Sequence, residues 1–255
     1  KGEFDRLILN TPPQVGKTVS AVVWAAFWYL ILHPTHRIII VCYGDSLAVK
    51  RGRSVRRLVE EFGARYGLRL DPASQAAHDW ALTTGGGIRA VGIGSGITGE
   101  PGDAILVDDP HKNREEAESA RTLETIWEWF TSVVLTRLHP DSSCVVIQTR
   151  WHPDDISGRL IKGGWDRINL PAMSDAGTAL WESHRPAKWL TEQRAAIGEY
   201  EWHALYQGEP RPRGGALFGP PSTCDSVPAS SRKSIGVDLA YTAKSSSDYS
   251  VALTL

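Results

Sequence analysis

Short apolar runs alternate with helical patterns from residue 6 to residue 162, and this alternation most limits how the chain can fold. Four runs are typical of buried strands, at 6–9, 37–42, 104–107 and 143–148. Helical patterns follow them at 16–32, 46–66, 114–138 and 153–162. Buried strands separated by crossover helices predict a mostly parallel sheet flanked by helices, which is an α/β fold.

The pattern changes in the remaining parts of the chain. Residues 71–99 combine short apolar stretches with glycine loops, which predicts short edge strands. Residues 171–231 are rich in Pro and Gly and carry one helical pattern near 191–197, which favours a linker subdomain. Strand patterns return in "SIGVDLAYTAKSSSDYSVALTL" as two runs around a Ser-rich turn, so a further domain is expected to begin over 232–255.

The stretch "LILNTPPQVGKTVSAVVWAA", residues 7–26, places a tight turn between a predicted strand and a predicted helix. Gly16, Lys17 and Thr18 match the second half of the phosphate-loop pattern G-x-x-x-x-G-K-[ST], but Thr11 replaces its first glycine. Backbone N–H groups at a helix start, a lysine and a hydroxyl can together hold phosphates and Mg²⁺. The alternative is a chance G-K-T at a strand-to-helix turn.

A second apolar run, "AILVDDP", ends in Asp108 and Asp109. In an open parallel sheet the carboxyl ends of the strands face the ligand crevice. There Asp108 would hold Mg²⁺ through water, and Asp109 would orient or deprotonate an attacking water. A third strand ends in Gln148 and Thr149, which could contact a γ-phosphate. The alternative for both groups is that they only cap the helices that follow.

Composition narrows the class of protein. The net charge of -1 excludes a uniformly basic nucleic-acid coat, so contact with DNA would need a local patch. Three widely spaced cysteines give neither a disulfide framework nor a zinc site, which fits a reducing cytosol. The longest apolar run, 19–32, is too short to span a bilayer, so no membrane partner is expected. Because the chain starts without Met and ends inside an apolar run, both ends are expected to be cuts.

The helical pattern from residue 46 has one basic side and one apolar side. The basic side carries Lys50, Arg53, Arg56 and Arg57, and the apolar side carries Val55, Leu58, Val59 and Phe62. A row of this kind can grip DNA phosphates without reading sequence. However, any amphipathic helix also needs a solvent-exposed polar face. We therefore favour the interpretation that these basic residues form such a face rather than a DNA-binding surface.

One aromatic cluster and one acidic cluster could each have either a structural or a functional role. In "TIWEWF", Trp127, Trp129 and Phe130 are expected to pack in a core or between subunits rather than stack on bases. His152 lies beside Asp154 and Asp155, which suggests a metal site. A helix start capped by the acids after a proline is the favoured alternative.

Taken together, these residues resemble the large subunit of tailed-phage terminases, the DNA-packaging motor. The loop "TPPQVGKT" is similar to the family's "PPR-x-GKS" variant, which also lacks the first glycine. The similarity continues through "SGITGEPGDAILVDDPHKNREEAES", "VVIQTRWHPDDISGRL", "EWHALYQGEPRPRGGALF" and "GVDLAYTAKSSSDYSVAL". The pattern "TRWH-x-DD-x-x-GRL" followed by "ALYQ-x-x-P" is far more specific than the phosphate loop alone.

The resemblance implies three parts. They are a P-loop ATPase core of the additional-strand type over 1–170, the linker subdomain over 171–231, and the first strands of an incomplete RNase H-like nuclease domain over 232–255. It implies ATP-driven translocation of double-stranded viral DNA into a procapsid at its portal, in the host cell cytoplasm. The implied partners are DNA, the portal protein, the small terminase subunit and further copies in a ring.

The resemblance also assigns residues to the ATPase site, whose implied cofactors are ATP and Mg²⁺. Lys17 and Thr18 bind phosphate and Mg²⁺, Asp108 assists the metal and Asp109 is the catalytic carboxylate. The other implied nucleotide-binding residues are Gln14, Gly16, Gln148 and Thr149.

For the nuclease, which would use Mg²⁺ or Mn²⁺ to cut concatemeric DNA, Asp238 matches the first metal-binding carboxylate and Asp248 is a weaker candidate. One strand pair is too little to form a rigid metal site. The 255-residue chain is therefore expected to leave DNA uncut, and cleavage is expected only with a complete C-terminal domain.

Three departures from the family pattern stand out. Gln14 replaces an Arg that many relatives carry, and Asp109 lies where many ATPases have Glu. No Arg occurs between residues 90 and 113. If a neighbouring subunit supplies an arginine to the site, the candidates are Arg89, Arg114 and Arg121.

Two other functions are consistent with parts of this sequence. A helicase-like P-loop ATPase would share both nucleotide motifs, but it should carry a second motor domain with helicase motifs of its own. A degenerate P-loop protein that forms part of a ring without hydrolysing ATP would explain Thr11, Gln14 and the missing arginine. ATP turnover with and without DNA separates these hypotheses.

Overall fold

An eight-stranded sheet is the centre of the first of two units, Lys1–Gly215, and the second unit is Ala216–Leu255. The computed structural model describes residues 5–97, 101–212, 235–238 and 251–254. The strand order is β3-β4-β5-β2-β6-β7-β1-β8. The strands are β1 (Arg6–Asn10), β2 (Arg37–Cys42), β3 (Leu70–Gln75), β4 (Asp79–Leu82), β5 (Gly87–Gly92), β6 (Ala104–Asp108), β7 (Ser143–Gln148) and β8 (Asp166–Asn169).

The sheet is mostly parallel, as the sequence predicts. The pairs β5–β2, β2–β6, β6–β7, β7–β1 and β1–β8 are parallel, and only the two pairs that involve β4 are antiparallel. Strand β7 lies between β1, which leads into the phosphate loop, and β6, which ends in the acidic pair. This is the additional strand that the resemblance implies.

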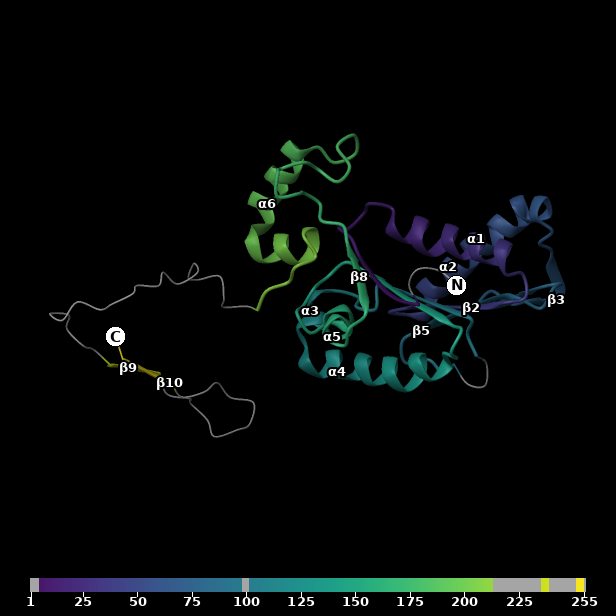
Figure 1. Ribbon diagram of the computed structural model, residues 1–255, viewed down its shortest axis with the longest axis horizontal. Coiled ribbons are helices and arrows are strands. Elements are labelled where there is room, and N and C mark those ends of the chain that lie inside the picture. The colour runs from purple at the N-terminus through teal and green to yellow at the C-terminus, as the bar shows by residue number, and fades with distance from the viewer. Residues whose placement is uncertain (1–4, 98–100, 213–234, 239–250, 255) are drawn as a thin grey trace. The chain divides into compact units, whose positions relative to one another are not determined.

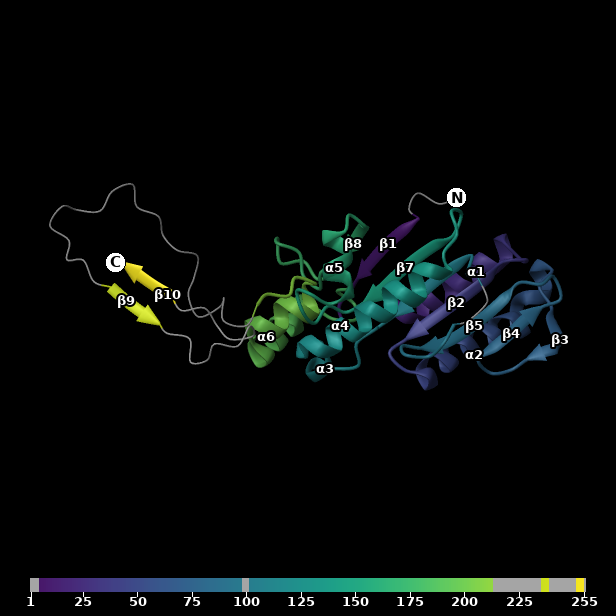
Figure 2. The same cartoon turned by 90° about the horizontal axis from the view of Figure 1, so that it is seen from below.

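Helices cover both faces of the sheet (Figures 1 and 2). One face carries α1 (Ala25–Leu32), with the π-helical turn η1 (Val19–Trp24) before it, and α2 (Asp45–Phe62), which the short η2 (Gly63–Tyr66) extends. The other face carries α4 (Ala120–Trp129), η3 (Phe130–Val134) and α5 (Ile156–Lys162). Two short elements complete this part of the chain, α3 (Arg114–Glu118) before α4 and η4 (Leu135–Arg137) after η3.

Strand β2 shows why the central strands have nearly continuous apolar runs. Its side chains alternate between the two faces, so Ile38 and Ile40 join the core beneath α1 and α2. Ile39 and Val41 join the core on the α4 side. Because helices bury both faces, positions along the strand must be apolar in succession.

Several predicted elements differ in detail from those observed. The sequence pattern predicts an edge strand at β5, but β5 lies inside the sheet, paired in parallel with β2. No sequence pattern predicts the short edge strand β8. The single helix expected over 114–138 is broken at Ser119, whose backbone is extended and whose side chain caps α4 by accepting a hydrogen bond from the Thr122 N–H. The helix expected from residue 153 begins at Ile156.

Residues 171–212, which we call the helical segment, form a small core of their own. The segment contains α6 (Ala187–Glu201) and η5 (Trp202–Tyr206), and Trp202 stacks on Tyr206 with ring centroids 4.9 Å apart. It is joined to the sheet where the Leu170 N–H donates to the Asn10 carbonyl at 2.9 Å. The segment therefore lies beside the carboxyl end of β1.

The second unit contains the two strands expected near the C-terminus. Strands β9 (Ile235–Asp238) and β10 (Val251–Thr254) pair antiparallel, with Asp238 opposite Val251. Asp248 lies outside the described residues. None of the helices in the described part of the chain combines the length and apolar character that crossing a membrane requires.

Candidate nucleotide site

Three adjacent strands bring the predicted site residues together at one edge of the sheet. In the parallel register, Asn10 of β1 lies opposite Gln148 of β7, and Asp108 of β6 lies opposite Ile147. The loops that leave these strands therefore begin side by side. This is the edge at which open α/β sheets bind ligands.

The phosphate loop needs a backbone that turns sharply between β1 and the first helix. Gly16 has φ 81°, a left-handed conformation that glycine adopts without strain. In the described part of the chain, only Gln14 (φ 57°) and Asp109 (φ 47°) are non-glycine residues with positive φ. Both are predicted site residues, and strained backbone of this kind is commonly kept where it serves function.

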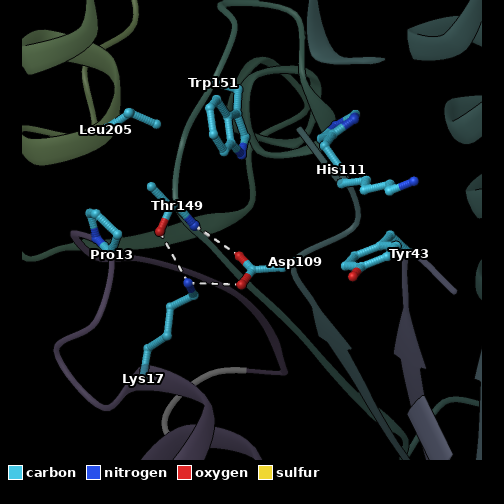
Figure 3. Close-up of a pocket in the computed structure, with 9 residues that line it drawn as sticks. Pro13, Lys17, Tyr43, Asp109, His111, Thr149, Trp151 and Leu205 are labelled. Atoms are coloured by element: carbon cyan, nitrogen blue, oxygen red, sulfur yellow. Dashed lines mark hydrogen bonds and ion pairs between the residues drawn. The ribbon is translucent and has the colours of Figure 1, made fainter. Parts of the chain in front are cut away.

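Lys17 lies at the centre of a cluster with Asp109 and Thr149 (Figure 3). Its ammonium is 2.8 Å from Asp109 Oδ2 and donates to Thr149 Oγ1 at 3.0 Å. The Thr149 N–H donates to Asp109 Oδ1 at 3.2 Å, and its hydroxyl donates to the Thr11 carbonyl at 3.1 Å. Thr149 therefore links the phosphate loop, the lysine and the acidic loop.

Thr18 forms the second link between the phosphate loop and the acidic pair. Its hydroxyl is 3.0 and 3.1 Å from the two Asp108 carboxylate oxygens. Arg51 of α2 donates from Nε to Asp108 Oδ2 at 3.1 Å. Burial raises the pKa of Asp108 and the neighbouring Asp109 charge raises it further, while Arg51, Lys17 and Thr18 act to lower it.

The Thr18 hydroxyl and the Asp108 carboxylate suit Mg²⁺ chemically. Magnesium prefers hard oxygen ligands, and it is commonly held by one or two protein oxygens with water and substrate phosphates completing the shell. Within the described residues there is no cluster of three or more His, Cys, Asp or Glu side chains arranged for a metal ion. A magnesium ion here would therefore rely on Thr18, Asp108 and the nucleotide.

A cavity of about 190 Å³ opens over this cluster. Pro13, Lys17, Asp109 and Thr149 line one side of it, and Trp151 and Leu205 line the other (Figure 3). A second cavity, about 290 Å³, lies against the start of the first helix at Ser20 and Ala21. Its wall includes Leu180 and the half-exposed Trp181 from the helical segment.

Gln148 lies in the sheet next to this cluster but does not join it. Its side chain is 1 % exposed, and within the described residues neither amide atom has a hydrogen-bond partner. Gln14 is hydrogen-bonded to a residue outside the loop. Arg185 of the helical segment donates from Nη2 to Gln14 Oε1 at 3.0 Å.

The loop after β7 is shaped by a buried ion pair. Arg150 Nε lies 2.8 Å from Asp155 Oδ2, and the side chains are 4 % and 0 % exposed. Asp155 also caps α5 by accepting from the Gly158 N–H at 2.9 Å, which confirms the helix-cap interpretation. A Cβ at Gly158 would lie 1.8 Å from the Pro153 carbonyl oxygen, so only glycine fits there.

The aromatic cluster of α4 and η3 packs in the core, as expected. Phe130 is fully buried, and Trp127 and Trp129 pack against the same cluster. In α2, Val55 and Val59 are buried while Lys50, Arg53 and Arg57 are exposed, which gives the helix the solvated basic face that the sequence predicts.

The three arginines considered for a neighbouring site differ in their surroundings. Arg114 forms ion pairs with Glu118 and Glu201 and lies over the Trp151 and Tyr200 rings. Arg89 Nη1 lies 3.5 Å from Asp79 Oδ2, an ion pair. Arg121 is exposed on α4. Two of the three therefore have roles within this chain.

Sequence reasoning missed two arginines that contact the site. Arg51 reaches Asp108 from a helix 57 residues away along the chain, and Arg185 reaches Gln14 from 171 residues away. Neither lies in a recognisable motif. Arg51 belongs to the basic helix, but three of the basic side chains that mark the basic side of that helix, Lys50, Arg53 and Arg57, are exposed.

The fold and this edge of the sheet define an α/β protein of the phosphate-loop class, with an additional strand between the loop strand and the acidic strand. Residues 8–220 match the family described as "Terminase large subunit, T4likevirus-type, N-terminal". The chain therefore belongs to the terminase large subunit family. A search of curated proteins gave no match.

Solved structures with the same fold include three phage proteins. The HK97 bacteriophage large terminase has a TM-score of 0.54 at 12 % identity, over 81 % of this chain and 47 % of that one. The Thermus phage P74-26 large terminase ATPase domain has a TM-score of 0.51 at 15 % identity, over 82 % and 90 %. A large terminase from a thermophilic bacteriophage, solved in complex with ATP-gamma-S, has a TM-score of 0.50 at 11 % identity, over 81 % and 47 %. The chain spans about half the length of the first and third of these proteins.

Proposed function

We propose that this chain binds and hydrolyses ATP and is the motor part of a viral DNA-packaging terminase. The observation that carries this proposal is the convergence of Lys17, Asp109 and Thr149 on one cavity, with Thr18 and Asp108 beside it. The family match and the thermophilic-phage terminase solved with ATP-gamma-S support it.

Each residue has a role that its geometry supports. The Lys17 ammonium would leave Asp109 to bind the β- and γ-phosphates, and Asp109 would then orient the attacking water and accept its proton. Thr18 and Asp108 would hold Mg²⁺, which when bound neutralises charge on the phosphate oxygens. The apolar cavity at Ser20 and Trp181 would receive the base.

The finer assignments follow from the family. ATP turnover would drive translocation of double-stranded DNA into a procapsid, by a ring of copies at the portal protein, with the small terminase subunit as a further partner in the host cell cytoplasm. Gln148 and Thr149 would couple hydrolysis to motion. Residues 232–255 would belong to an RNase H-like nuclease with Asp238 and Asp248 as Mg²⁺ or Mn²⁺ ligands, and residues 171–231 would link it to the ATPase core at 1–170.

ATP hydrolysis by the purified chain tests the proposal, measured with and without linear double-stranded DNA. We expect Mg²⁺-dependent turnover that Lys17→Ala abolishes together with ATP binding, because that change removes the charge that faces the phosphates. Lys162→Ala, which removes an exposed lysine that pairs with Asp154, is the matched control and should behave as the wild type. Unchanged ATP affinity in Lys17→Ala would refute the site, and a wild type without turnover would favour the non-hydrolysing ring component.

A further inference from the structure

Arg185 places a positive charge on the phosphate loop from a distant part of the chain. Its guanidinium donates from Nη1 to the Pro13 carbonyl at 2.9 Å and from Nη2 to Gln14 Oε1 at 3.0 Å. Both acceptors are neutral. Among the described residues, no Asp or Glu forms an ion pair with Arg185.

Three other arginines, Arg194, Arg167 and Arg114, are compensated in a different way. Arg194 Nε is 2.7 Å from Glu199 Oε1, Arg167 Nη1 is 2.8 Å from Glu209 Oε1, and Arg114 forms an ion pair with Glu201. Each has a carboxylate partner. Within the described part of the chain, the charge of Arg185 is therefore left uncompensated at the loop where an anion is proposed to bind.

The guanidinium is also held in place by other contacts within the chain. Its Cζ lies 5.0 Å from the centre of the Trp189 ring, a cation–π contact. Its backbone N–H donates to the Trp181 carbonyl at 2.8 Å, which fixes the turn before α6. An arginine whose fork is already oriented loses less freedom when it binds phosphate oxygens.

Position along the loop indicates which phosphate lies within reach. Pro13, which accepts from Arg185, lines the same cavity as Asp109, whereas Lys17 lines both cavities. Asp109 is the proposed partner of the attacking water, so the γ-phosphate belongs in this cavity. The base would lie at the other cavity, beyond Ser20.

We propose that Arg185 binds the γ-phosphate of ATP and thereby ties the helical segment to the nucleotide state of the phosphate loop. This inference rests on the proposed ATPase function. Arg185 would exchange its neutral acceptors for phosphate oxygens, a charge-assisted and bidentate interaction. Loss of the γ-phosphate would return it to Pro13 and Gln14. The segment would then be held differently before and after hydrolysis.

Calorimetric titration with ATP-gamma-S and with ADP, both with Mg²⁺, tests the inference on the wild type and on Arg185→Gln. A hydrogen bond to a charged group is worth enough that Arg185→Gln should weaken ATP-gamma-S binding about 10- to 100-fold. Its affinity for ADP should stay near that of the wild type. Arg194→Gln is the matched control, because Arg194 also lies over an aromatic ring on this segment but pairs with Glu199, and it should change neither affinity.

The outcomes separate the two proposals. A wild type that binds neither nucleotide refutes the proposed function. A wild type that binds both, with Arg185→Gln unchanged or equally weakened for both nucleotides, refutes the γ-phosphate contact and leaves Arg185 as a structural pin on the loop. Arg185→Lys should recover part of the preference for ATP-gamma-S, because it keeps the charge without the fork.

A charge swap provides a second test. Gln14 Oε1 and the Arg185 guanidinium occupy the same region, so Gln14→Arg combined with Arg185→Gln moves the charge onto the loop itself. The double variant should regain the preference for ATP-gamma-S over ADP that the single Arg185→Gln variant loses. No recovery would contradict the charge argument.

Discussion

Thr149→Val removes one hydroxyl from the centre of the proposed site and keeps the shape of the side chain. Thr149 is 4 % exposed, and its hydroxyl both accepts from Lys17 and donates to the Thr11 carbonyl. Valine leaves both partners one hydrogen bond short. The Thr149 N–H still reaches Asp109, so the acidic loop should keep its position.

The size of the effect follows from these two hydrogen bonds. A neutral hydrogen bond is worth about 0.5–1.5 kcal/mol and one to a charged group about 1.5–3 kcal/mol. Because Lys17 keeps Asp109 as a partner, we take the lower end and expect a total loss of about 2 kcal/mol. For a unit of this size that lowers the thermal midpoint by about 4–8 °C. If half to all of this loss of about 2 kcal/mol also applies to the transition state of ATP hydrolysis, turnover falls about 5- to 30-fold.

Thermal unfolding and steady-state ATP hydrolysis on the same preparation measure both effects. Thr149→Ser is the matched control, because it keeps the hydroxyl and should stay close to the wild type in midpoint and turnover. A Thr149→Val variant with wild-type midpoint and wild-type turnover would refute the role assigned to this hydroxyl.

The remaining predictions concern the groups around this centre. Asp155→Ala leaves Arg150 buried and unpaired, so it should lower the free energy of unfolding in urea by about 3–5 kcal/mol, whereas an unchanged midpoint would show that the pair is dispensable. Burial raises the pKa of Asp108, so the folded chain holds that proton more tightly than the unfolded chain. Stability should therefore fall as pH rises from the ordinary range of an aspartate through the raised pKa. Asp108→Asn should remove this slope in urea titrations, and an identical slope in both proteins would contradict the assignment. Phe130→Ala, in the fully buried core, should cost about 3–5 kcal/mol in the same assay while ATP affinity is unchanged below the unfolding transition.

The sequence predicts those parts of the molecule that local pattern determines. The four central strands are visible because burial on both faces demands continuous apolar runs such as that of β2. The phosphate loop and the acidic pair are visible because residues that end parallel strands must meet at one edge. For this reason the amino-acid sequence alone is enough to predict that Lys17, Asp109 and Thr149 lie together.

Elements set by tertiary contact could not be predicted in this way. The short β8 has no clear period, and its place depends on pairing with Leu7 to Asn10 of β1. The break at Ser119 depends on a single capping side chain within a continuous helical pattern. Arg51 and Arg185 reach the site from positions 57 and 171 residues away from their partners, and no motif marks either one.

The Asp109→Asn variant tests the central claim most directly, when ATP affinity and ATP turnover are measured on the same sample beside the wild type. The amide has the size of the carboxylate, and its oxygen can still accept from the Thr149 N–H, but its NH₂ group cannot accept from Lys17 and it cannot accept a proton from water. We predict that ATP binding is kept and that turnover falls about 100-fold or more, the size expected for removal of a catalytic base. Turnover equal to that of the wild type would contradict the assignment of Asp109 and, with it, the site as the centre of ATP hydrolysis.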